Sequence, residues 1–252
     1  MPIQAYPTGS QSFMSRSNPI YRLAGDFISL LFPRLCQACG DHLVRNEEVI
    51  CSLCLLDMPL TDFHSMRENE LEKSLWGRCF VERAAAYAYY QPGGKMQALI
   101  HRLKYDGITM VGTYLGRIYG TILKEDGFLD GIDMIVPVPL HPAKERQRGF
   151  NQARVICDAI SDATGIPVEN GLLHRTVRTA SQTRKSRVER WENVENIFKT
   201  SSLDIIPGSH ILLVDDVITT GSTIEACVNS IKEACEARVS VVSMAAAVSR
   251  LT

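Results

Sequence analysis

Ile211-Leu-Leu-Val-Asp-Asp-Val-Ile-Thr-Thr-Gly-Ser-Thr223 is the stretch of sequence that decides the fold. Its first four residues are apolar and typical of a buried strand, and apolar residues then recur at helical intervals from residue 224 to 235. A strand, a tight turn and a helix form the unit from which parallel sheets are built. The turn is therefore predicted to lie at the carboxyl end of a central strand, where open α/β sheets bind ligands.

The residues at the end of this strand favour a phosphorylated sugar as the ligand. Asp215 and Asp216 can accept hydrogen bonds from ribose hydroxyls, and we interpret them as the catalytic pair. The turn offers backbone N–H groups, hydroxyls and the positive end of a helix dipole to one phosphate. The alternative is an ordinary strand with a capped turn, since Asp, Thr, Gly and Ser also suit that geometry. The predicted ligands of the 5-phosphate are Thr219, Thr220, Gly221, Ser222 and Thr223.

The rest of the chain divides into a small amino-terminal part and an alternating part. Residues 1–19 are expected to be a flexible extension, and residues 20–74 to hold a short helix, a four-cysteine module and a polar linker at 61–73. In residues 75–252, strands are predicted at 81–90, 132–138 and 239–248 besides the one at 211, with helices between them. This order predicts an α/β fold with a mainly parallel sheet covered by helices on both sides.

Four cysteines form two Cys-x-x-Cys pairs, Cys36 with Cys39 and Cys51 with Cys54, separated by eleven residues. Two such pairs on turns can point four thiolates at one tetrahedral centre, which suits zinc. Because all four ligand positions are filled, we expect a structural or docking role for the metal. The alternative of two redox pairs lacks a thioredoxin-like βαβ pattern around either pair.

The bulk composition excludes several classes of protein. Hydrophobic residues make up 45% of the chain, charged residues 22%, and the net charge is -1, so neither disorder nor a strongly basic surface is indicated. No apolar run approaches the roughly 20 residues that cross a bilayer, and the first residues lack a secretion signal. We expect a cytoplasmic protein without a membrane span, and its oligomeric state stays open.

Residues 211–223 resemble the motif with which type I phosphoribosyltransferases bind 5-phosphoribosyl 1-pyrophosphate (PRPP). The chain as a whole resembles the ComF family (ComFC/GntX-like), in which an amino-terminal zinc finger precedes a phosphoribosyltransferase-like domain. The resemblance covers nearly everything after residue 25. The further segments that carry it are His101-Arg-Leu-Lys-Tyr105, Val136-Pro-Val-Pro-Leu-His141, Arg148-Gly-Phe-Asn-Gln152, and Arg175-Thr176 with Gln182.

The resemblance implies a pyrophosphate side next to the strand that ends at residue 138. Pro139, Leu140 and His141 would lie on the loop that faces the pyrophosphate, and Lys144 and Arg148 would supply positive charge. A diphosphate leaving group carries several negative charges, which fixed donors and Mg²⁺ offset. The cofactors implied are therefore structural zinc and Mg²⁺ bound together with PRPP.

The polar loop at residues 175–190 resembles the flexible hood that closes over PRPP in related transferases. Closure of such a loop would exclude water from a cation-like ribosyl centre. The alternative is a charged surface loop. The closing contacts implied are Arg175, Thr176, Gln182 and Arg187.

Two functions follow from these patterns. The first, which we favour, is an enzyme that transfers phosphoribosyl from PRPP to an unidentified nucleophile with release of pyrophosphate. The second is a non-enzymatic adaptor for uptake of single-stranded DNA, because the resemblance links the chain to natural transformation. In that case the zinc module would dock on competence proteins, and PRPP or a nucleotide would regulate the adaptor. The net charge of -1 does not favour extensive non-specific DNA binding.

Overall fold

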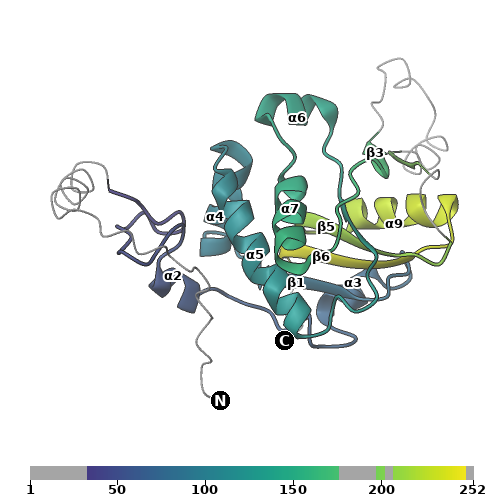
Figure 1. The fold of residues 1–252 in the computed structure, drawn as a ribbon, viewed down its shortest axis with the longest axis horizontal. Coiled ribbons are helices and arrows are strands. Elements are labelled where there is room, and N and C mark those ends of the chain that lie inside the picture. The colour runs from purple at the N-terminus through teal and green to yellow at the C-terminus, as the bar shows by residue number, and fades with distance from the viewer. Residues whose placement is uncertain (1–32, 176–196, 202–206, 248–252) are drawn as a thin grey trace.

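A four-stranded parallel sheet forms the centre of the computed structural model, which describes residues 33–175, 197–201 and 207–247 (Figure 1). The strand order is β1 (Ala84–Tyr89), β6 (Arg238–Ala246), β5 (His210–Ile218) and β2 (Met134–Pro137), and every neighbouring pair is parallel. These strands are buried along nearly their whole length, as expected for a sheet covered on both faces. The predicted parallel α/β fold is confirmed.

Helices connect the strands and cover both faces of the sheet. Helices α4 (Lys95–Tyr105) and α5 (Thr109–Glu125) lead from β1 to β2, whereas α9 (Ser222–Ala234) leads from β5 to β6 in the opposite direction across the sheet. Because crossovers between parallel strands are right-handed, α5 and α9 cover opposite faces. Helix α7 (Gln152–Thr164) packs beside α5 and against β2 and β5, and it follows the short helix α6 (Pro142–Arg148). Among the described helices, none is both long and apolar enough to cross a membrane.

Helices α5 and α7 approach each other closely because α5 presents glycine every fourth residue at Gly112, Gly116 and Gly120. A Cβ at position 116 would lie only 2.8 Å from the Cβ of Ala159 and 3.0 Å from the carbonyl oxygen of Ile156. Protein interiors are packed too densely to absorb such contacts without a shift of one helix. The glycine stripe therefore sets the distance between the two helices.

Gly116→Ala is expected to lower the free energy of unfolding by about 1–3 kcal/mol, because the added methyl group overpacks this contact. The better helix propensity of alanine, about 1 kcal/mol, offsets part of that loss. Urea denaturation measures the difference. In the double variant Gly116→Ala/Ala159→Gly the gain and the loss of helix propensity cancel, and the contact between the two methyl groups is absent. Its free energy of unfolding should therefore lie closer to that of the wild type. A Gly116→Ala protein more stable than the wild type would contradict the close approach.

The stretch at residues 61–73, predicted as a polar linker, packs against the edge of the sheet instead. Leu60 forms an antiparallel bridge with Ala88 of β1, and the N–H of Thr61 donates to the carbonyl of Tyr87. The short helix α3 (Glu70–Leu75) follows, with Asn69 accepting from two N–H groups of its first turn. Polar side chains in this stretch are buried because backbone groups of the neighbouring strand and helix satisfy them. The division of the chain near residue 75 stays a prediction.

Two short antiparallel strands, β3 (Leu173–Arg175) and β4 (Phe198–Thr200), lie outside the main sheet. They lie at the two ends of the polar region 171–200. Apolar residues in this region do not recur at the spacing of a helix or a strand until its last residues. β4 packs on α9, where the hydroxyls of Thr200 and Ser230 lie 2.9 Å apart. The two ends of the region therefore pair with each other, and they lie beside α9, the helix that follows the predicted phosphate turn.

Candidate functional site

The carboxylates of Asp215 and Asp216 lie on β5 near its carboxyl end, as the sequence predicted. Successive side chains of a strand point to opposite faces, so the two carboxylates do not face one neighbour together. Asp216 is buried, and its Oδ1 lies 2.8 Å from the Nζ of Lys104 on α4. The Oδ1 of Asp215 accepts a hydrogen bond from the N–H of Asp216 at 2.8 Å. Among the described residues, Asp216 is the one of the two aspartates that forms an ion pair.

Burial and, next, repulsion from Asp216 raise the pKa of Asp215 to about 7, although the N–H of Asp216 and the charges of Lys104 and Arg175 act to lower it. The energetic cause is the loss of hydration of the charged form in the interior. Carboxylates with such raised pKa values are frequent at functional sites. At neutral pH this group is divided between its protonated and ionised forms, and a nearby cation or hydroxyl donor can shift that balance.

Asp215→Asn is expected to gain stability over the wild type as the pH rises, by on the order of 2 kcal/mol between pH 5 and pH 8. Native Asp215 keeps its proton to about pH 7, whereas the unfolded chain releases it near the ordinary value of 3.8. The native state binds more protons between these values, so wild-type stability falls as the pH rises through them. Urea midpoints of both proteins at several pH values provide the measurement. Asp158→Asn, which removes an exposed carboxylate on α7, should show no such trend, and an Asp215→Asn trend as flat as this control would contradict the assignment.

The turn between β5 and α9 has the geometry predicted for a phosphate cradle. Gly221 is the N-cap of α9 with φ of 74°, a left-handed conformation that favours glycine. Thr219 and Thr220 are exposed before it, and Ser222 and Thr223 open the helix. The N–H groups of a first helical turn have no partner within the helix, and that of Ser222 donates to the hydroxyl of Thr220 at 3.5 Å. The five predicted phosphate ligands are thus contiguous around the amino terminus of a 13-residue helix.

Arg78 braces this turn from a distant part of the sequence. Its guanidinium donates to the carbonyl of Thr220 and to the hydroxyl of Ser222, and it forms an ion pair with Glu225 at 2.6 Å. The side chains of Arg78 and Glu225 are each about one-third exposed. A Cβ on Gly221 would approach the Nη1 of Arg78 at 3.3 Å. No pattern in the sequence indicates this contact, because Arg78 stands in no recognisable motif.

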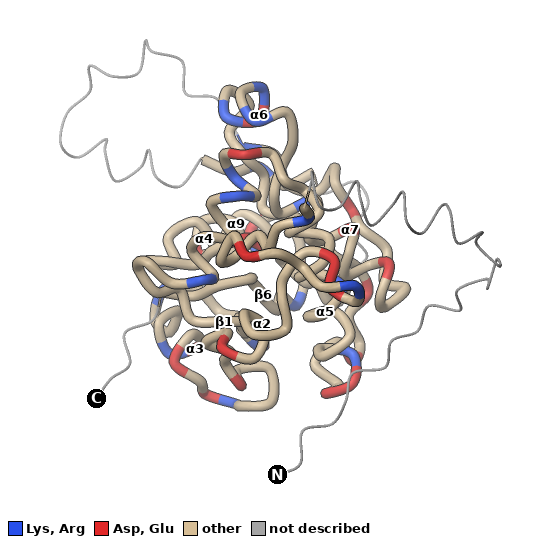
Figure 2. The backbone as a smooth tube through the Cα atoms, turned by 90° about the vertical axis from the view of Figure 1, so that its left-hand side faces the viewer, with Lys and Arg blue, Asp and Glu red and all other residues tan. Residues whose placement is uncertain are grey.

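The predicted pyrophosphate residues fall into two neighbouring groups. Lys144 and Arg148 of α6 line a cavity of about 380 Å³ together with Lys104 and Tyr105 of α4, and the guanidinium of Arg148 lies 5.3 Å from the centre of the Tyr105 ring. Three cations and one carboxylate, that of Asp106, surround this cavity, which suits an anion. Figure 2 shows the basic residues on α6.

Pro139 and Leu140 do not line that cavity but a separate one of about 400 Å³, which Arg175 also borders. His141 is the N-cap of α6, where its Nδ1 accepts from the N–H of Ala143 at 3.1 Å. The structure therefore does not bring all five predicted pyrophosphate residues around one cavity.

Lys104 is the functional residue that the sequence analysis did not single out, although it stands in the quoted segment at 101–105. It pairs with Asp216 and also lines the basic cavity, so it connects the end of β5 with that cavity. Its side chain is 23% exposed and that of Asp216 is 11% exposed. Charges this far removed from water interact more strongly than surface pairs do.

A double-mutant cycle of Lys104→Met with Asp216→Asn is expected to give a coupling energy of about 1–2 kcal/mol, because each single change leaves a partly buried charge without its partner. Urea denaturation of the four proteins measures the coupling. The matched cycle is Arg117 with Asp162, whose side chains are 61% and 62% exposed and whose coupling should stay within about 0.5 kcal/mol. Equal coupling in the two cycles would contradict a special role for Lys104.

Of the four predicted closing contacts, the structure describes Arg175 alone. Its guanidinium lies 5.4 Å from the centre of the Phe198 ring, so it joins β3 to β4, and its charge lowers the pKa of Asp215. Arg175 is therefore the residue that links the hairpin to the carboxylate. Thr176, Gln182 and Arg187 lie outside the described residues, and the closing role of the loop stays a prediction.

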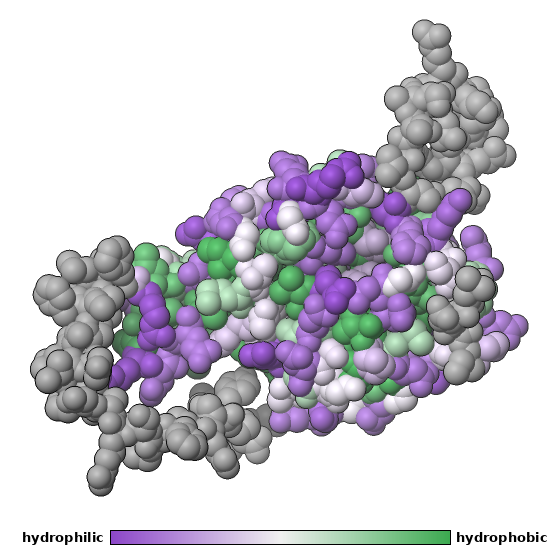
Figure 3. Space-filling view, turned by 45° about the horizontal axis from the view of Figure 1, so that its top comes forward, coloured by the Kyte–Doolittle hydropathy of each residue, from purple (hydrophilic) through white to green (hydrophobic). Residues whose placement is uncertain are grey.

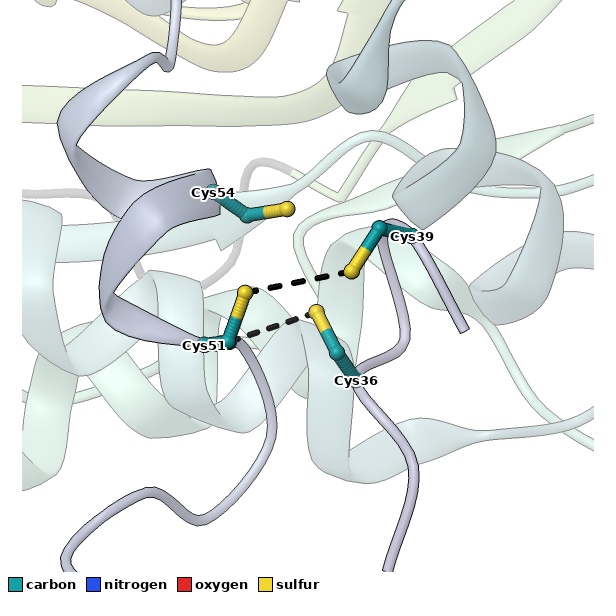
Figure 4. A group of neighbouring side chains, drawn as sticks. All are labelled: Cys36, Cys39, Cys51 and Cys54. Atoms are coloured by element: carbon teal, nitrogen blue, oxygen red, sulfur yellow. Dashed lines mark hydrogen bonds between the residues drawn. The ribbon is translucent and has the colours of Figure 1, made fainter. Parts of the chain in front are cut away.

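The four predicted zinc ligands converge at the opposite end of the molecule from α9 (Figures 1 and 4). Their sulfur atoms all lie within 4.8 Å of one another, and those of Cys39 and Cys51 are 3.8 Å apart. Two sulfurs bound to one tetrahedral zinc at about 2.3 Å each are separated by about 3.8 Å. Cys54 lies in the short helix α2 (Ser52–Leu56). The donor set and its spacing fit a structural zinc ion.

Backbone amides point at two of the four sulfur atoms. The N–H of Cys51 points at the sulfur of Cys36 at 3.2 Å, and the N–H of Asp41 at that of Cys39 at 3.5 Å. Burial raises the pKa of Cys36, but hydrogen bonds from the amides of Cys51, Cys39 and Ala38 outweigh it and lower the pKa to about 7. Similar amide contacts are the usual outer support of metal-binding side chains.

Apolar side chains remain exposed on the outer surface of the cysteine module. Figure 3 shows apolar residues among polar ones at this end of the molecule. Ordinary monomer surfaces carry single exposed apolar residues, but a group on so small a module is typical of a contact surface. The group consists of Leu35, Val44, Leu53 and Leu56, which are 43%, 65%, 77% and 74% exposed.

Comparisons with known proteins find one matching domain family and several relatives. Residues 155–251 match the phosphoribosyl transferase domain family. The DNA utilization protein YhgH of Escherichia coli (strain K12) is 30% identical over 195 residues, which cover 75% of this chain and 80% of that protein. Competence protein F of Haemophilus influenzae is 28% identical (75% and 86% covered), and competence protein ComFC of Bacillus subtilis is 25% identical (76% and 75% covered).

Solved structures cover a little more than half of this chain. Glutamine PRPP amidotransferase from B. subtilis gives a TM-score of 0.37 at 21% identity, with 52% of this chain and 26% of that chain covered. An adenine phosphoribosyltransferase gives 0.35 at 17% identity, with 57% and 74% covered. Both overlaps are partial, so the assignment of the fold rests on the parallel sheet and on the matched domain family.

Proposed function

This chain belongs to the ComF family, and from that premise we propose that it serves DNA uptake and binds PRPP with Mg²⁺ at the end of β5. The observation that carries the proposal is the pair Asp215 and Asp216 directly before a glycine turn that opens α9. Carboxylates suit ribose hydroxyls, and helix amino termini suit phosphate. Names of relatives that refer to DNA utilization and competence support the cellular role.

Each part of PRPP has a chemically matched group of residues in this proposal. The turn at residues 219–223 holds the 5-phosphate, and Asp215 accepts hydrogen bonds from the ribose. The cavity bordered by Lys104, Lys144 and Arg148 receives the pyrophosphate. Carboxylate and diphosphate oxygens are ligands that Mg²⁺ prefers, and the ion would offset the charge of the leaving group. In this arrangement the ammonium group of Lys104 contacts both the carboxylate of Asp216 and the pyrophosphate.

The favoured activity is phosphoribosyl transfer, in which a nucleophile forms a bond to C1 of the ribose. The bond from C1 to the pyrophosphate oxygen breaks, and pyrophosphate leaves with the electron pair. Side chains of this chain position the two groups and stabilise the developing charges. Arg78 contributes indirectly, because it keeps the phosphate turn in place through Thr220 and Ser222.

A second candidate function is that of an adaptor which binds single-stranded DNA without transferring phosphoribosyl. The exposed apolar group on the cysteine module favours it, since such a surface fits a protein partner. In this case PRPP or a nucleotide at β5 would regulate docking. The zinc ion would keep the docking surface folded, because so small a module has few core residues of its own.

Calorimetry with PRPP and Mg²⁺ on the full chain tests the first function. Saturable binding, followed by release of pyrophosphate when candidate bases and amines are added, is the expected result. Binding without release from any nucleophile would favour the adaptor. No binding at either low or high Mg²⁺ would reject the sugar-phosphate site. DNA binding measured on the same preparation would then test the adaptor function by itself.

A further inference from the structure

A cavity of about 640 Å³ lies between α3 and the start of β1, on the side of the molecule that carries α9 (Figure 1). Its lining residues come from two nearby stretches of the chain, at 67–72 and at 76–82. Among the described residues, none lines both this cavity and the basic cavity beside Lys104. The cavity is therefore separate from the groups assigned to the pyrophosphate.

Large apolar side chains at this cavity remain exposed. Trp76 is 56% exposed and Phe80 is 64% exposed, and both line the cavity. Met66, which directly precedes the lining residue Arg67, is 50% exposed. Tryptophan, phenylalanine and methionine are enriched in protein interfaces, and tryptophan is frequent among the residues that dominate binding energy. Three such side chains beside one cavity are typical of a contact surface.

Carboxylates give the cavity an excess of negative charge. Three glutamates and two arginines line it, and one of these arginines, Arg78, is already paired with Glu225. The carboxylate of Glu72 accepts hydrogen bonds from two backbone N–H groups, and this residue is 7% exposed. Among the described residues, neither Glu68 nor Glu82 forms an ion pair. Two carboxylates at this cavity can therefore pair with cations of a partner.

Cations of the chain itself already lie against this surface. The Nζ of Lys232 on α9 lies 4.5 Å from the centre of the Phe80 ring, and the guanidinium of Arg67 donates to the carbonyl of Glu82 at 3.4 Å. Cations are attracted to the faces of aromatic rings, and most strongly to that of tryptophan. No cation of a described residue lies over the ring of Trp76. That ring is therefore open to a cation from a partner.

The loop that carries Glu68 has an unfavourable backbone conformation. Glu68 has φ of 55°, and it is the one non-glycine residue with positive φ in the part of the chain that the structure describes. Its N–H donates to the Oε2 of Glu72 at 2.6 Å, which fixes the loop while the Glu68 side chain stays exposed. Backbone strain of this kind clusters at ligand-binding sites.

Arg78 connects this cavity with the predicted phosphate turn. It lines the cavity, and its guanidinium donates to the carbonyl of Thr220 and to the hydroxyl of Ser222. A ligand in the cavity that moves Arg78 therefore also changes the turn. When two ligands affect the same residue in this way, each changes the affinity of the other by the same factor.

We propose that this cavity, the Trp76/Phe80 cavity, is the docking site for a segment of a partner protein that carries lysine or arginine beside an apolar residue, and that Arg78 couples docking to the phosphate turn. The basic residue pairs with the unpaired carboxylates, and the apolar residue packs on the exposed rings. The coupling rests on the proposed function, whereas docking does not. This surface lies beside α9, away from the exposed apolar group of the cysteine module at the other end of the molecule.

Selection from a library of random peptides of about twelve residues, displayed on phage, tests docking with the full chain as the target. The expected consensus has lysine or arginine next to an apolar residue. A fluorescent peptide with the selected consensus is then the probe for anisotropy. Trp76→Ser and Glu68→Gln/Glu82→Gln should each weaken its binding about tenfold or more, because each removes one half of the recognition.

The matched controls change the same kinds of residue outside the cavity. Met110→Ser removes an apolar side chain that is 52% exposed on α5, and Asp158→Asn/Asp162→Asn removes two exposed carboxylates from α7. Both should leave the affinity of the peptide within about twofold. Circular dichroism checks that every variant is folded.

Several outcomes would overturn docking of a basic segment. A selected consensus without basic residues, a library that enriches no sequence, or unchanged affinity in both cavity variants would each do so. Sedimentation velocity tests the other possible occupant, a second copy of this chain. A dimer that Trp76→Ser dissociates would show that the cavity is covered by that copy, and it would also reject the proposal.

Titration of the peptide with and without PRPP and Mg²⁺ tests the coupling. Saturating PRPP should change the affinity of the peptide by about fivefold or more, and the peptide should change the affinity of PRPP by the same factor. In Arg78→Met the factor should fall close to one while the peptide still binds. A factor close to one in the wild type would reject the role of Arg78. Failure of PRPP to bind would reject the proposed function and the coupling with it, whereas docking would still be decided by the cavity variants.

Discussion

Asp215→Asn/Asp216→Asn is expected to weaken binding of PRPP with Mg²⁺ by about 100-fold or more. Hydrogen bonds between a carboxylate and a hydroxyl contribute about 1.5–3 kcal/mol each, and two of them correspond to at least two orders of magnitude in affinity. Calorimetry at constant Mg²⁺ gives the dissociation constants. Because Asp215 is the proposed ligand of the ribose and Asp216 holds Lys104, the loss should appear in the affinity whatever the change in thermal stability.

The control for this experiment is Asp158→Asn/Asp162→Asn, which removes two exposed carboxylates from α7 and keeps the same change in net charge. PRPP affinity in this control should equal that of the wild type. If both double variants lost affinity equally, the loss would reflect net charge rather than the carboxylates of β5. If neither lost affinity, the ribose would be held elsewhere and the proposed site would be rejected.

Cys36→Ser is expected to reduce bound zinc from about one equivalent to near zero and to unfold the cysteine module. Structural zinc sites in small modules contribute on the order of 10 kcal/mol to folding, far more than the few buried residues of this segment can replace. Metal analysis after purification and limited proteolysis of residues 33–58 measure both effects. A strong chelator added to the wild type should give the same cleavage pattern.

Cys79→Ser is the matched control for the zinc experiment, because Cys79 is partly buried but lies outside the four-sulfur cluster. It should keep its zinc and its resistance to the protease. Wild-type zinc content in Cys36→Ser would reject the ligand assignment. The sheet should still melt cooperatively in Cys36→Ser, since its core does not include the metal.

The parallel sheet and the cysteine cluster were predictable because each leaves a local pattern in the sequence. An apolar run before Asp215 marks a buried strand, and the spacing of Cys36 to Cys54 brings four sulfurs together regardless of the rest of the fold. Both patterns depend on residues close in the chain. The matched domain family and the observed strands confirm the α/β fold that they indicated.

The contacts that complete the candidate site were not predictable in the same way. Lys104 is 112 positions before its partner Asp216, and Arg78 is 142 positions before Thr220. Only the sheet order brings them together, and no local period reveals a pair of that kind. The ligands assigned at the site remain predictions. The predicted pyrophosphate residues line two different cavities, so a motif alone does not determine where each side chain lies.

Polarity was a misleading guide at residues 61–73. Asn69 is 4% exposed and Glu72 7% exposed, although both residue types usually lie at the surface. The amide of Asn69 donates to the carbonyls of Phe63, Met66 and Ala84, and a carboxylate oxygen of Glu72 accepts from the N–H of Ala84. Buried polar groups are tolerated where their hydrogen bonds are satisfied in this manner. The amino-acid composition of a stretch does not show whether its polar groups are hydrogen-bonded in the fold.

The pairing of residues 59–61 with β1 has a practical consequence for truncated versions of this protein. Backbone groups of Pro59, Leu60 and Thr61 occupy the outer border of β1, a strand with four alanines and two tyrosines. A fragment that started at residue 76 would leave that border bare, and bare borders of this kind recruit other molecules into intermolecular sheets. A truncated α/β part should therefore stay monodisperse only when it keeps residues 59–61, that is, when the chain is cut before residue 58.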